Sequence, residues 1–346
     1  MIVRRHGEKY NFYGDTETGI TMRWGSSVNV NPEYAPWPEL ADISISNHCT
    51  KGCEFCYKGS ENNNSFMSTE EYEYVLSALQ SEKWGNVFQV ALGGGEPLEH
   101  PDFIDIINVT NEKGIVANFT TNGIHLNEEI ANEIKGKVGA VAISVNRIEE
   151  LNMKKVKVLT DSEIKTNIHF VLDNTSIYEA INILKGKYNE LLDKINGIIF
   201  LTYKPAGRAT IDKCLSMDDE KLMEFISLVE NNECITRIGF DACFVPLLMK
   251  YTGVNADYID SCECGFFSVY IDEKMNVKPC SFANNDRFTF NLKEYDMKDI
   301  WENKYGILRK EMLSNSCINE CINKNNCRGK CGYFDTLSFC YNLENK

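Results

Sequence analysis

Apolar and polar residues alternate in short runs over the first 245 residues of the chain. The run at residues 41–46 (ADISIS) has the two-residue period of a half-buried strand. A helical pattern follows it, and a capping box of Ser68 and Glu71 marks where that helix begins. Similar strand runs recur at residues 87–92, 115–120, 140–145, 166–171, 197–203 and 235–240, and helical patterns are found at about 68–83, 101–113, 127–136, 149–160, 176–194 and 218–232. The pattern therefore predicts that strand and helix alternate at least six times.

Such alternation is typical of an α/β fold in which parallel strands are joined by right-handed helical crossovers. The fold is then either a doubly wound sheet or a full or partial (βα) barrel, and in both the ligands bind at the carboxyl ends of the strands. After about residue 245 the pattern changes to short strand and turn segments, with one helix expected near residues 296–313. We therefore expect a strand-rich extension at 1–40, the α/β unit at 41–245 and a smaller module at 246–346.

Composition changes this picture mainly through the cysteines. The chain has 346 residues, of which 43% are hydrophobic, and a formal net charge of −14. A chain of this length buries most of its apolar surface without covalent help, so its 14 cysteines are not needed as a disulfide scaffold. No secretory signal and no apolar run near the roughly 20 residues of a membrane span are evident, which predicts a cytoplasmic protein with reduced thiols. The negative charge, without any cluster of basic residues, argues against nucleic acid as a partner.

Three cysteines come directly after the first predicted strand, with the spacing C-x3-C-x2-C. They are Cys49, Cys53 and Cys56. Thiolates on a short flexible segment can converge on one small inorganic centre. Three are one fewer than the four that usually hold a [4Fe–4S] cluster, which would leave one iron open to a substrate. The spacing alone is also compatible with an incomplete zinc site or a chance grouping.

Glycine and polar residues stand at the ends of the next three predicted strands. The second strand ends in Gly93–Gly95 followed by Glu96, where the backbone can approach a ligand and the carboxylate can bind an ammonium group. The third strand ends at Thr121 and Asn122, and the fourth carries Ser144 near its end. Each motif alone is weak evidence. Four polar motifs at the ends of four successive strands predict one common binding site.

Together these motifs resemble those of the radical S-adenosylmethionine (SAM) enzymes, over roughly residues 41–240. The loop from Cys49 to Cys56 is similar to the cluster loop of that family, including an aromatic residue, Phe55, before the third cysteine. The Gly94–Glu96 segment is similar to the family's motif for the SAM amino group. The fold that this resemblance implies is a partial (βα)6 barrel of TIM type.

The same resemblance implies a chemistry and a set of ligands. A [4Fe–4S] cluster would bind the amine and carboxylate of SAM at its open iron. It would reduce the sulfonium by one electron, which gives methionine and a 5′-deoxyadenosyl radical that abstracts hydrogen from a substrate carbon. The cofactor performs the difficult step while the protein positions and shields it. The implied residues are Cys49, Cys53 and Cys56 for the cluster, Gly94, Gly95 and Glu96 for the amino group, Thr121, Asn122 and Ser144 for the ribose and methionine parts, and Phe55 and Tyr57 for the adenine.

Eight further cysteines lie between Cys262 and Cys340, where the chain resembles the SPASM domain, which carries auxiliary [4Fe–4S] clusters. It departs from that family at Met275, where glycine is usual, and in the three residues rather than two between Cys317 and Cys321. Eight thiolates would fill two four-iron sites, whereas two zinc sites of four cysteines each are the alternative. The resemblance implies that Cys262, Cys264, Cys280 and Cys331 hold the first auxiliary cluster and Cys317, Cys321, Cys327 and Cys340 the second.

Three cysteines stand apart from these groups. Cys234 and Cys243 are expected to be small buried hydrophobes, although Cys243 could replace one of the close pair Cys262 and Cys264 as a ligand. Cys214 follows the sixth predicted strand, so it could face the barrel mouth and return a hydrogen atom to a substrate radical. The five histidines have no ligand spacing and are assigned to the surface or the core.

Radical SAM proteins with a SPASM domain largely modify peptides or proteins. The resemblance therefore implies maturation of a ribosomally made peptide, by a cross-link, a thioether or inversion of a stereocentre. Only 48 residues precede Cys49, too few for a complete leader-recognition domain, so we expect a separate protein or residues 1–40 to bind the leader. The acidic surface favours a neutral or basic leader, and a flavodoxin or ferredoxin would supply electrons.

Two other functions stay open. One is a protein oxidase similar to the sulfatase maturases. The sequence argues against it, because the strand with Ser144 continues as Val145-Asn146, where related enzymes often have Asp. The other is an iron–sulfur electron carrier or redox sensor that never cleaves SAM. An electron carrier would have no use for the Gly94–Glu96 motif.

Overall fold

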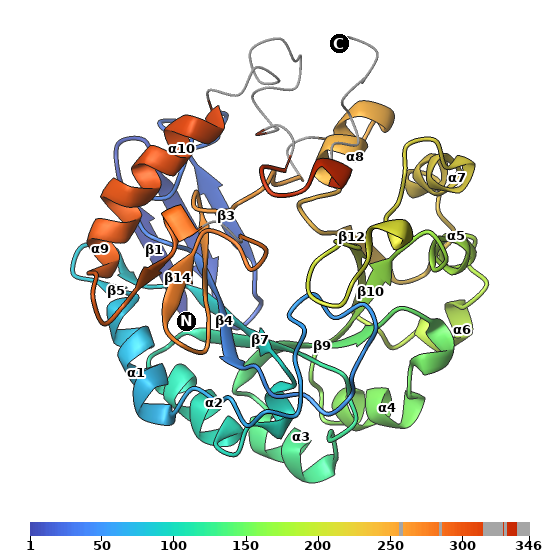
Figure 1. The fold of residues 1–346 in the computed structure, drawn as a ribbon, viewed down its shortest axis with the longest axis horizontal. Coiled ribbons are helices and arrows are strands. Elements are labelled where there is room, and N and C mark those ends of the chain that lie inside the picture. The colour runs from blue at the N-terminus through green and yellow to red at the C-terminus, as the bar shows by residue number, and fades with distance from the viewer. Residues whose placement is uncertain (256–258, 284–285, 314–327, 329–330, 338–346) are drawn as a thin grey trace.

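The computed structural model describes residues 1–255, 259–283, 286–313, 328 and 331–337. Its centre is a ten-stranded sheet with the order β12-β11-β10-β9-β8-β7-β4-β13-β14-β15. The sheet curves around a common interior and helices lie around its outside (Figure 1). Its strands are β4 (Leu40–Ser46), β7 (Gln89–Gly94), β8 (Val116–Thr121), β9 (Val138–Val145), β10 (Thr166–Leu172), β11 (Gly197–Thr202), β12 (Arg237–Phe240), β13 (Ser268–Ile271), β14 (Asn276–Lys278) and β15 (Phe290–Asn291).

The strands from β4 to β12 are parallel to their neighbours, which confirms the predicted partial (βα) barrel. The alternation of residues on β4 shows how the pattern makes this layer. Ala41, Ile43 and Ile45 are fully buried in the main apolar core together with residues of the first helix. Asp42 and Ser44, which alternate with them, therefore face the interior of the barrel.

Helices cover the outer face of the sheet in chain order. They are α1 (Thr69–Ala78), α2 (Phe103–Glu112), α3 (Glu128–Ile134), α4 (Met153–Asp161), α5 (Ile177–Leu184), α6 (Asn189–Leu192), α7 (Glu220–Val229), α8 (Val245–Tyr251), α9 (Met297–Asp299) and α10 (Tyr305–Leu313). The predicted capping box is present, because the backbone N–H of Glu71 donates to the Ser68 hydroxyl and the Ser68 N–H donates to the Glu71 carboxylate, each at 3.2 Å.

Two of the predicted helices are interrupted in the structure. The helix expected at 176–194 is divided into α5 and α6, because Gly186 between them adopts a left-handed φ of 70° that ends the first helix. The helix expected at 296–313 is present as α9 and α10 joined by a π-helical turn at Ile300–Lys304.

The chain beyond residue 245 returns to the barrel, which the pattern did not predict. Strand β13 pairs in parallel with β4, with Tyr270 beside Asp42, and β14 and β15 extend the same sheet in antiparallel fashion. The expected boundary at residue 245 stays a prediction.

Met275, in the turn between β13 and β14, has a left-handed φ of 63°, the conformation that glycine adopts most easily.

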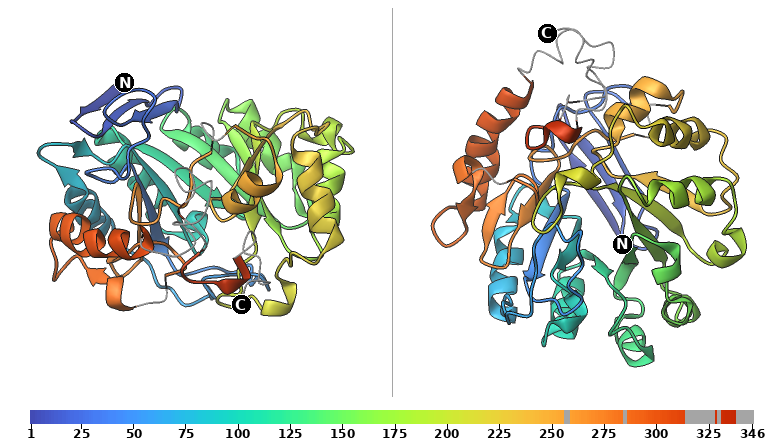
Figure 2. Two further views of the ribbon diagram at one scale, coloured as in Figure 1. Left: turned by 90° about the horizontal axis from the view of Figure 1, so that it is seen from above. Right: turned by 45° about the vertical axis from the view of Figure 1, so that its right-hand side comes forward.

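A separate antiparallel sheet of β1 (Ile2–His6), β2 (Asn11–Asp15) and β3 (Thr21–Trp24) lies at the amino end of the barrel strands (Figure 2). The hydroxyl of Tyr10 donates to Glu39 at 2.8 Å, directly before β4. The guanidinium of Arg23 lies 2.7 Å from the carboxylates of both Glu39 and Glu263. This sheet therefore contacts the end of the barrel that is opposite to the carboxyl ends of its strands. A small hairpin of β5 (Gln80–Ser81) and β6 (Gly85–Asn86) follows α1.

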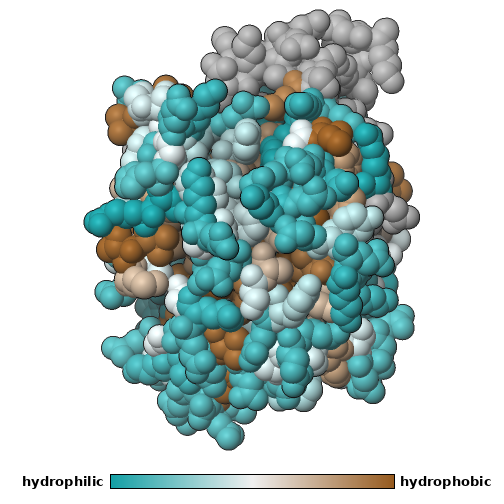
Figure 3. All heavy atoms as spheres, turned by 90° about the vertical axis from the view of Figure 1, so that its left-hand side faces the viewer, coloured by the Kyte–Doolittle hydropathy of each residue, from teal (hydrophilic) through white to brown (hydrophobic). Residues whose placement is uncertain are grey.

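One face of the molecular surface shows how polar and apolar side chains are distributed. The face that carries α1, α9 and α10 is largely hydrophilic with small separate apolar patches (Figure 3). Among the described residues, no helix has the length and apolar character that crossing a membrane requires.

Candidate active site

The cysteine loop begins where β4 ends, at the carboxyl end of the barrel. Cys49, Cys53 and Cys56 are partly buried free thiols. Burial raises the pKa of the Cys53 thiol, and the negative charge of Cys49 and Cys56 raises it further. Three thiolates on this short loop would repel one another. A cationic centre would relieve this repulsion, because it stabilises the deprotonated form of each ligand.

A turn from the opposite side of the barrel binds the cysteine loop. The guanidinium of Arg208 donates to the carbonyl of Cys53 at 2.9 Å and to the carbonyl of Ser60 at 2.7 Å. The backbone N–H of Arg208 donates to the carbonyl of Cys56 at 3.0 Å. Gly207 has a left-handed φ of 63°, and a Cβ at this position would lie 2.4 Å from the Cys56 carbonyl oxygen. The turn after β11 therefore fixes the backbone of the loop that carries the thiols.

Glu96, Thr121 and Asn122 meet at the carboxyl ends of β7 and β8. Glu96 is 2% exposed, and its carboxylate accepts hydrogen bonds from the Thr121 hydroxyl at 2.6 Å, the Asn122 N–H at 2.7 Å and the Leu98 N–H at 3.1 Å. Burial nevertheless raises the pKa of Glu96. A buried carboxylate held in one orientation can bind a cation such as an ammonium group.

Gly94 and Gly95 pack closely against the backbone that leads into the cysteine loop, and their predicted contact with the SAM amino group stays a prediction. A Cβ at Gly94 would lie 2.1 Å from the carbonyl oxygen of Ser46, and a Cβ at Gly95 would lie 1.9 Å from that of His48. The close approach that glycine permits here is to the chain's own backbone, directly before the cysteine loop. At Gly93, by contrast, a Cβ would meet no atom within 4 Å, so this position faces open space.

Two buried amide side chains support the presence of a ligand at these strand ends. Nδ2 of Asn122 and Oδ1 of Asn146 are buried and make no hydrogen bond to the described part of the chain. Asn122 follows β8 and Asn146 follows β9, two residues after Ser144. Buried polar atoms normally have partners, so a bound molecule with a matching acceptor and donor would satisfy them. Asn146 was not predicted as a binding residue.

The two aromatic residues of the loop differ in their surroundings. Phe55 is partly buried. Tyr57 packs its ring against that of Phe282, with the centroids 4.7 Å apart, and burial raises its pKa. Since Phe282 comes two residues after Cys280, Tyr57 links the first cysteine loop to the second group of cysteines. A place near adenine stays a prediction for both residues.

Two histidines contact the carboxylate of Glu99, and a third lies on β10. His48 and His125 lie 3.3 and 3.1 Å from the carboxylate of Glu99, which also accepts a hydrogen bond from the Thr50 hydroxyl at 2.5 Å. Glu99 thus holds the start of the cysteine loop. His169 on β10 lies 3.2 Å from the Thr120 hydroxyl, and burial lowers its pKa to about 4, so its imidazole is neutral at pH 7.

A lysine from the cysteine loop enters the barrel interior. Nζ of Lys58 lies 3.0 Å from the Ser44 hydroxyl, 2.9 Å from that of Tyr270 and 3.1 Å from the carboxylate of Glu273. Asp42 faces the same interior, and burial raises its pKa to about 6 although Lys58 acts in the opposite direction. The interior of the barrel is therefore lined by polar and ionisable groups beneath the predicted SAM site.

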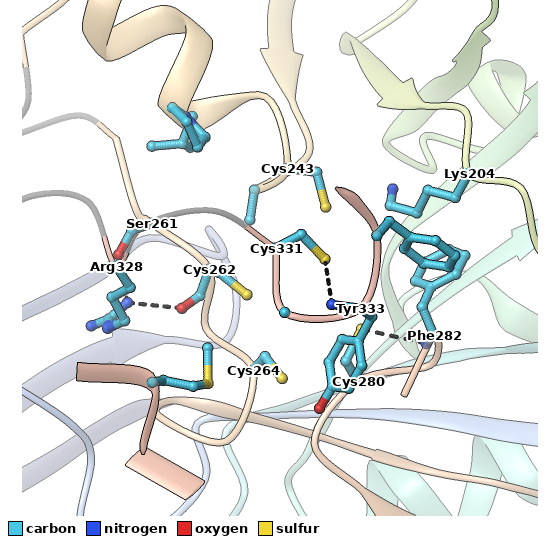
Figure 4. A pocket seen from close by; sticks show the side chains of 16 residues that line it. Lys204, Cys243, Ser261, Cys262, Cys264, Cys280, Phe282, Arg328, Cys331 and Tyr333 are labelled. Atoms are coloured by element: carbon cyan, nitrogen blue, oxygen red, sulfur yellow. Dashed lines mark hydrogen bonds between the residues drawn. The ribbon is translucent and has the colours of Figure 1, made fainter. Parts of the chain in front are cut away.

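A second group of thiols lines a cavity next to the barrel, which we call the five-cysteine cavity (Figure 4). The four cysteines predicted for the first auxiliary cluster lie there together, and Cys243 joins them. The buried Lys204 and the partly buried Arg328 lie on opposite sides of the thiols, and no Asp or Glu is among the described residues that line the cavity. The cysteines are Cys243, Cys262, Cys264, Cys280 and Cys331.

The thiols and the two cations fit an anionic group held by cysteines. The neighbouring Cys264 side chain lowers the pKa of the Cys262 thiol to about 7. In the described parts of the chain, no three His, Cys, Asp or Glu side chains are arranged to hold a single metal ion. In a four-iron cluster each thiolate binds its own iron, so its ligands stand farther apart than those of one ion. The second predicted set, Cys317, Cys321, Cys327 and Cys340, lies outside the described residues.

The remaining two lone cysteines lie elsewhere. Cys214 follows the short helical turn at Ile211–Lys213, and burial raises the pKa of its thiol. Its role as a hydrogen-atom donor stays a prediction. Cys234 packs against the main apolar core, as expected for a small hydrophobe.

These features define a (βα) barrel protein whose ligand site lies at the carboxyl ends of the strands, with three thiols on the loop after its first barrel strand. Residues 43–202 match the model of the Radical SAM superfamily, so this part of the chain is similar to a radical SAM domain. The match implies a [4Fe–4S] cluster and SAM, and the binding of these groups by Cys49, Cys53, Cys56 and Glu96 stays a prediction.

Several curated proteins are similar in sequence. The mycofactocin maturase MftC of Mycobacterium tuberculosis is 22% identical over 309 residues, which cover 82% of this chain and 75% of MftC. A probable GTP 3′,8-cyclase of Methanocaldococcus jannaschii is 35% identical over 124 residues, which cover 35% of this chain and 41% of that protein.

Solved structures share the fold over most of the chain. Streptococcus suis SuiB bound to SAM superposes with a TM-score of 0.72 at 17% identity, and the match covers 95% of this chain and 94% of SuiB. The protein anSMEcpe, solved with SAM and a peptide, gives a TM-score of 0.61 at 17% identity and covers 85% of this chain and 89% of its own.

Proposed function

We propose that this protein is a radical SAM enzyme that matures a ribosomally made peptide. The observation that carries the proposal is the contact between its two cysteine sites. The ring of Tyr57, next to Cys56, packs on the ring of Phe282, close to Cys280, with the centroids 4.7 Å apart. A SAM site and an auxiliary cluster joined in this way would both face the polar interior of the barrel. The likeness to a maturase over 82% of the chain supports the same conclusion.

Each part of the site has a definite task in this proposal. Cys49, Cys53 and Cys56 would hold the cluster that, when reduced, cleaves SAM and so supplies the 5′-deoxyadenosyl radical. Glu96, already fixed by its donors, would bind the SAM amino group, and its burial excludes water that would compete for that group. Thr121, Asn122 and Ser144 would contact the ribose and methionine parts, with Phe55 and Tyr57 near the adenine.

The five-cysteine cavity would hold the first auxiliary cluster through Cys262, Cys264, Cys280 and Cys331. The peptide would then lie in the barrel interior, where the neutral imidazole of His169 and the carboxyl of Asp42 can donate or accept hydrogen bonds. A small flavodoxin or ferredoxin would supply electrons. Since residues 1–40 lie at the amino end of the barrel, away from Glu96, a separate leader-binding protein is the simpler partner.

The first experiment tests SAM cleavage. The anaerobically reconstituted chain with dithionite and SAM should form 5′-deoxyadenosine, and the Cys49/Cys53/Cys56→Ala triple variant should form none. Cys234→Ala is the matched control, because this thiol packs on the apolar core away from both sites and should leave the rate unchanged. Absence of 5′-deoxyadenosine from the native chain, or its unchanged formation in the triple variant, would contradict an enzymatic role and leave the electron-carrier alternative.

The second experiment tests the substrate. A small peptide encoded beside this gene, incubated with the active enzyme, should lose two hydrogen atoms if a cross-link or thioether forms. In D2O it should gain one deuterium if a stereocentre is inverted. Tandem mass spectrometry distinguishes these products from an aldehyde on a single side chain, which would favour the sulfatase-maturase-like oxidase instead.

A further inference from the structure

A buried ion pair stands at the edge of the five-cysteine cavity, and neither SAM binding nor cluster ligation requires it. Nζ of Lys204 lies 2.6 Å from Oδ2 of Asp241 and donates to the carbonyl of Thr202 at 3.0 Å. The side chains of Lys204 and Asp241 are only 6% and 16% exposed. Removing two charges from water costs several kcal/mol for each ion, and an apolar pair of similar volume often folds as well. Folding alone therefore does not explain this pair.

The carboxylate of the pair is rigidly held behind the ammonium. Oδ1 of Asp241 accepts from the Thr202 hydroxyl at 2.7 Å, and Oδ2 accepts from the Thr202 N–H at 3.2 Å. Thr202 ends β11 and Asp241 directly follows β12, so two neighbouring strands of the barrel fix its position. The sheet thus orients Asp241, and Asp241 orients Lys204.

The ammonium, and not the carboxylate, reaches the cavity. Lys204 lines the five-cysteine cavity, whereas Asp241 does not. Nζ of Lys204 lies 4.7 Å from the centroid of the Phe282 ring, and Figure 4 shows the side chain directed toward Cys243. The positive charge of Lys204 therefore acts on Cys280, whereas on Cys243 the negative charge of Asp241 acts more strongly than the charge of Lys204.

We propose that Lys204 holds a fixed positive charge beside the auxiliary cluster and thereby raises the reduction potential of that cluster, with Asp241 as the residue that positions the ammonium. The inference rests on the proposed function, since it requires a cluster in the five-cysteine cavity. Reduction takes one electron from an external reductant and adds one negative charge to a cluster that four thiolates already make anionic. A nearby cation in a medium of low dielectric stabilises this added charge more than it would in water.

Two substitutions should move the potential in opposite directions. Lys204→Met removes the positive charge, so the cluster should become harder to reduce and its potential more negative. Asp241→Asn keeps a side chain that can accept from Thr202 but removes the negative charge, so the potential should become less negative. A purely structural role for the pair would move both variants in the same direction, because either change would loosen the same packing.

The measurement is an EPR-monitored redox titration of the full chain after anaerobic reconstitution. The Cys49/Cys53/Cys56→Ala background removes the SAM cluster, and the signal lost in Cys280→Ala identifies the cluster of the cavity. In Lys204→Arg the reduction potential of the cavity cluster should stay near that of the background chain, because arginine keeps the positive charge. Lys137→Met is the matched control, since this half-buried lysine bonds to Asn108 at 2.8 Å and does not line the cavity.

Normal iron content with an unchanged potential in Lys204→Met overturns the proposal, and so do shifts of the same sign in both charge variants. If Lys204→Met does not take up iron, Asp241→Asn decides: a less negative potential supports the inference, and any other result contradicts it. Failure of the proposed function looks different, because the chain with intact Cys49, Cys53 and Cys56 would then form no 5′-deoxyadenosine from SAM, whatever the potential of the cavity cluster.

Discussion

Asp42 occupies a position where its charge opposes folding. It faces the barrel interior between Ala91 and Tyr270 on the neighbouring strands, and burial raises its pKa from 3.8 to about 6. A group whose pKa is higher in the folded chain than in the unfolded chain stabilises the fold at low pH, and this contribution is lost as the pH rises through the folded value. The ionised form of Asp42 therefore lowers the free energy of unfolding at pH 7, as is common for residues of a functional site.

Asp42→Asn should accordingly stabilise the chain in a pH-dependent way. A difference of about two pKa units corresponds to up to about 3 kcal/mol, so the free energy of unfolding should rise by at most that amount at pH 7.5. The gain should shrink as the pH falls through 6 and vanish near pH 4, and denaturant titrations at several pH values measure it. The exposed Asp218→Asn is the control and should show no such dependence. A gain that is equal at all pH values would mean that Asp42 is not destabilised by its charge.

At the scale of elements, the turn at residues 205–208 explains how the cysteine loop keeps its shape. A loop rich in cysteine and glycine has many conformations, and ordering it costs entropy. Arg208 offsets this cost through its side-chain hydrogen bonds to the carbonyls of Cys53 and Ser60. The contact between this turn and the cysteine loop could not be predicted from the sequence, because Arg208 lies 155 and 148 residues from its partners Cys53 and Ser60.

Arg208→Met should therefore loosen the cluster loop while the barrel stays folded. Each hydrogen bond from a charged side chain contributes roughly 1.5–3 kcal/mol to stability, and this contribution is lost in the variant. We expect lower iron retention on dilution into chelator and an altered EPR response to SAM, with partial recovery in Arg208→Lys, which can restore one bond. Arg237→Met changes an exposed arginine at the start of β12 and serves as the control. Unchanged iron retention and EPR in Arg208→Met would exclude a positioning role for this residue.

At the scale of the whole molecule, the sequence predicted the elements that depend on neighbouring residues, but it did not predict the contacts between segments that are distant along the chain. The alternation of residues at 41–46 or 166–171 predicted strands that the structure places at Leu40–Ser46 and Thr166–Leu172. The pairing of β13 with β4 joins segments from the two ends of the chain, so no local pattern could predict it. For the same reason the sequence left open whether Cys243 is a small core residue or a ligand, and in the structure it packs against the apolar core and also lies among the thiols of the cavity.

The joining of the chain's two halves also determines how iron should be distributed. A SAM cluster and two auxiliary clusters correspond to about twelve iron atoms per chain, and they lie on separate sets of cysteines. The Cys49/Cys53/Cys56→Ala variant should therefore lose about four iron atoms and keep the rest, because the five-cysteine cavity and the later cysteines are untouched. Iron, zinc and sulfide analysis after anaerobic reconstitution measures this directly. Zinc in place of iron in the variant would show that the second module is a structural metal domain, and the contact of Tyr57 with Phe282 would then join a SAM site to a redox-inactive one.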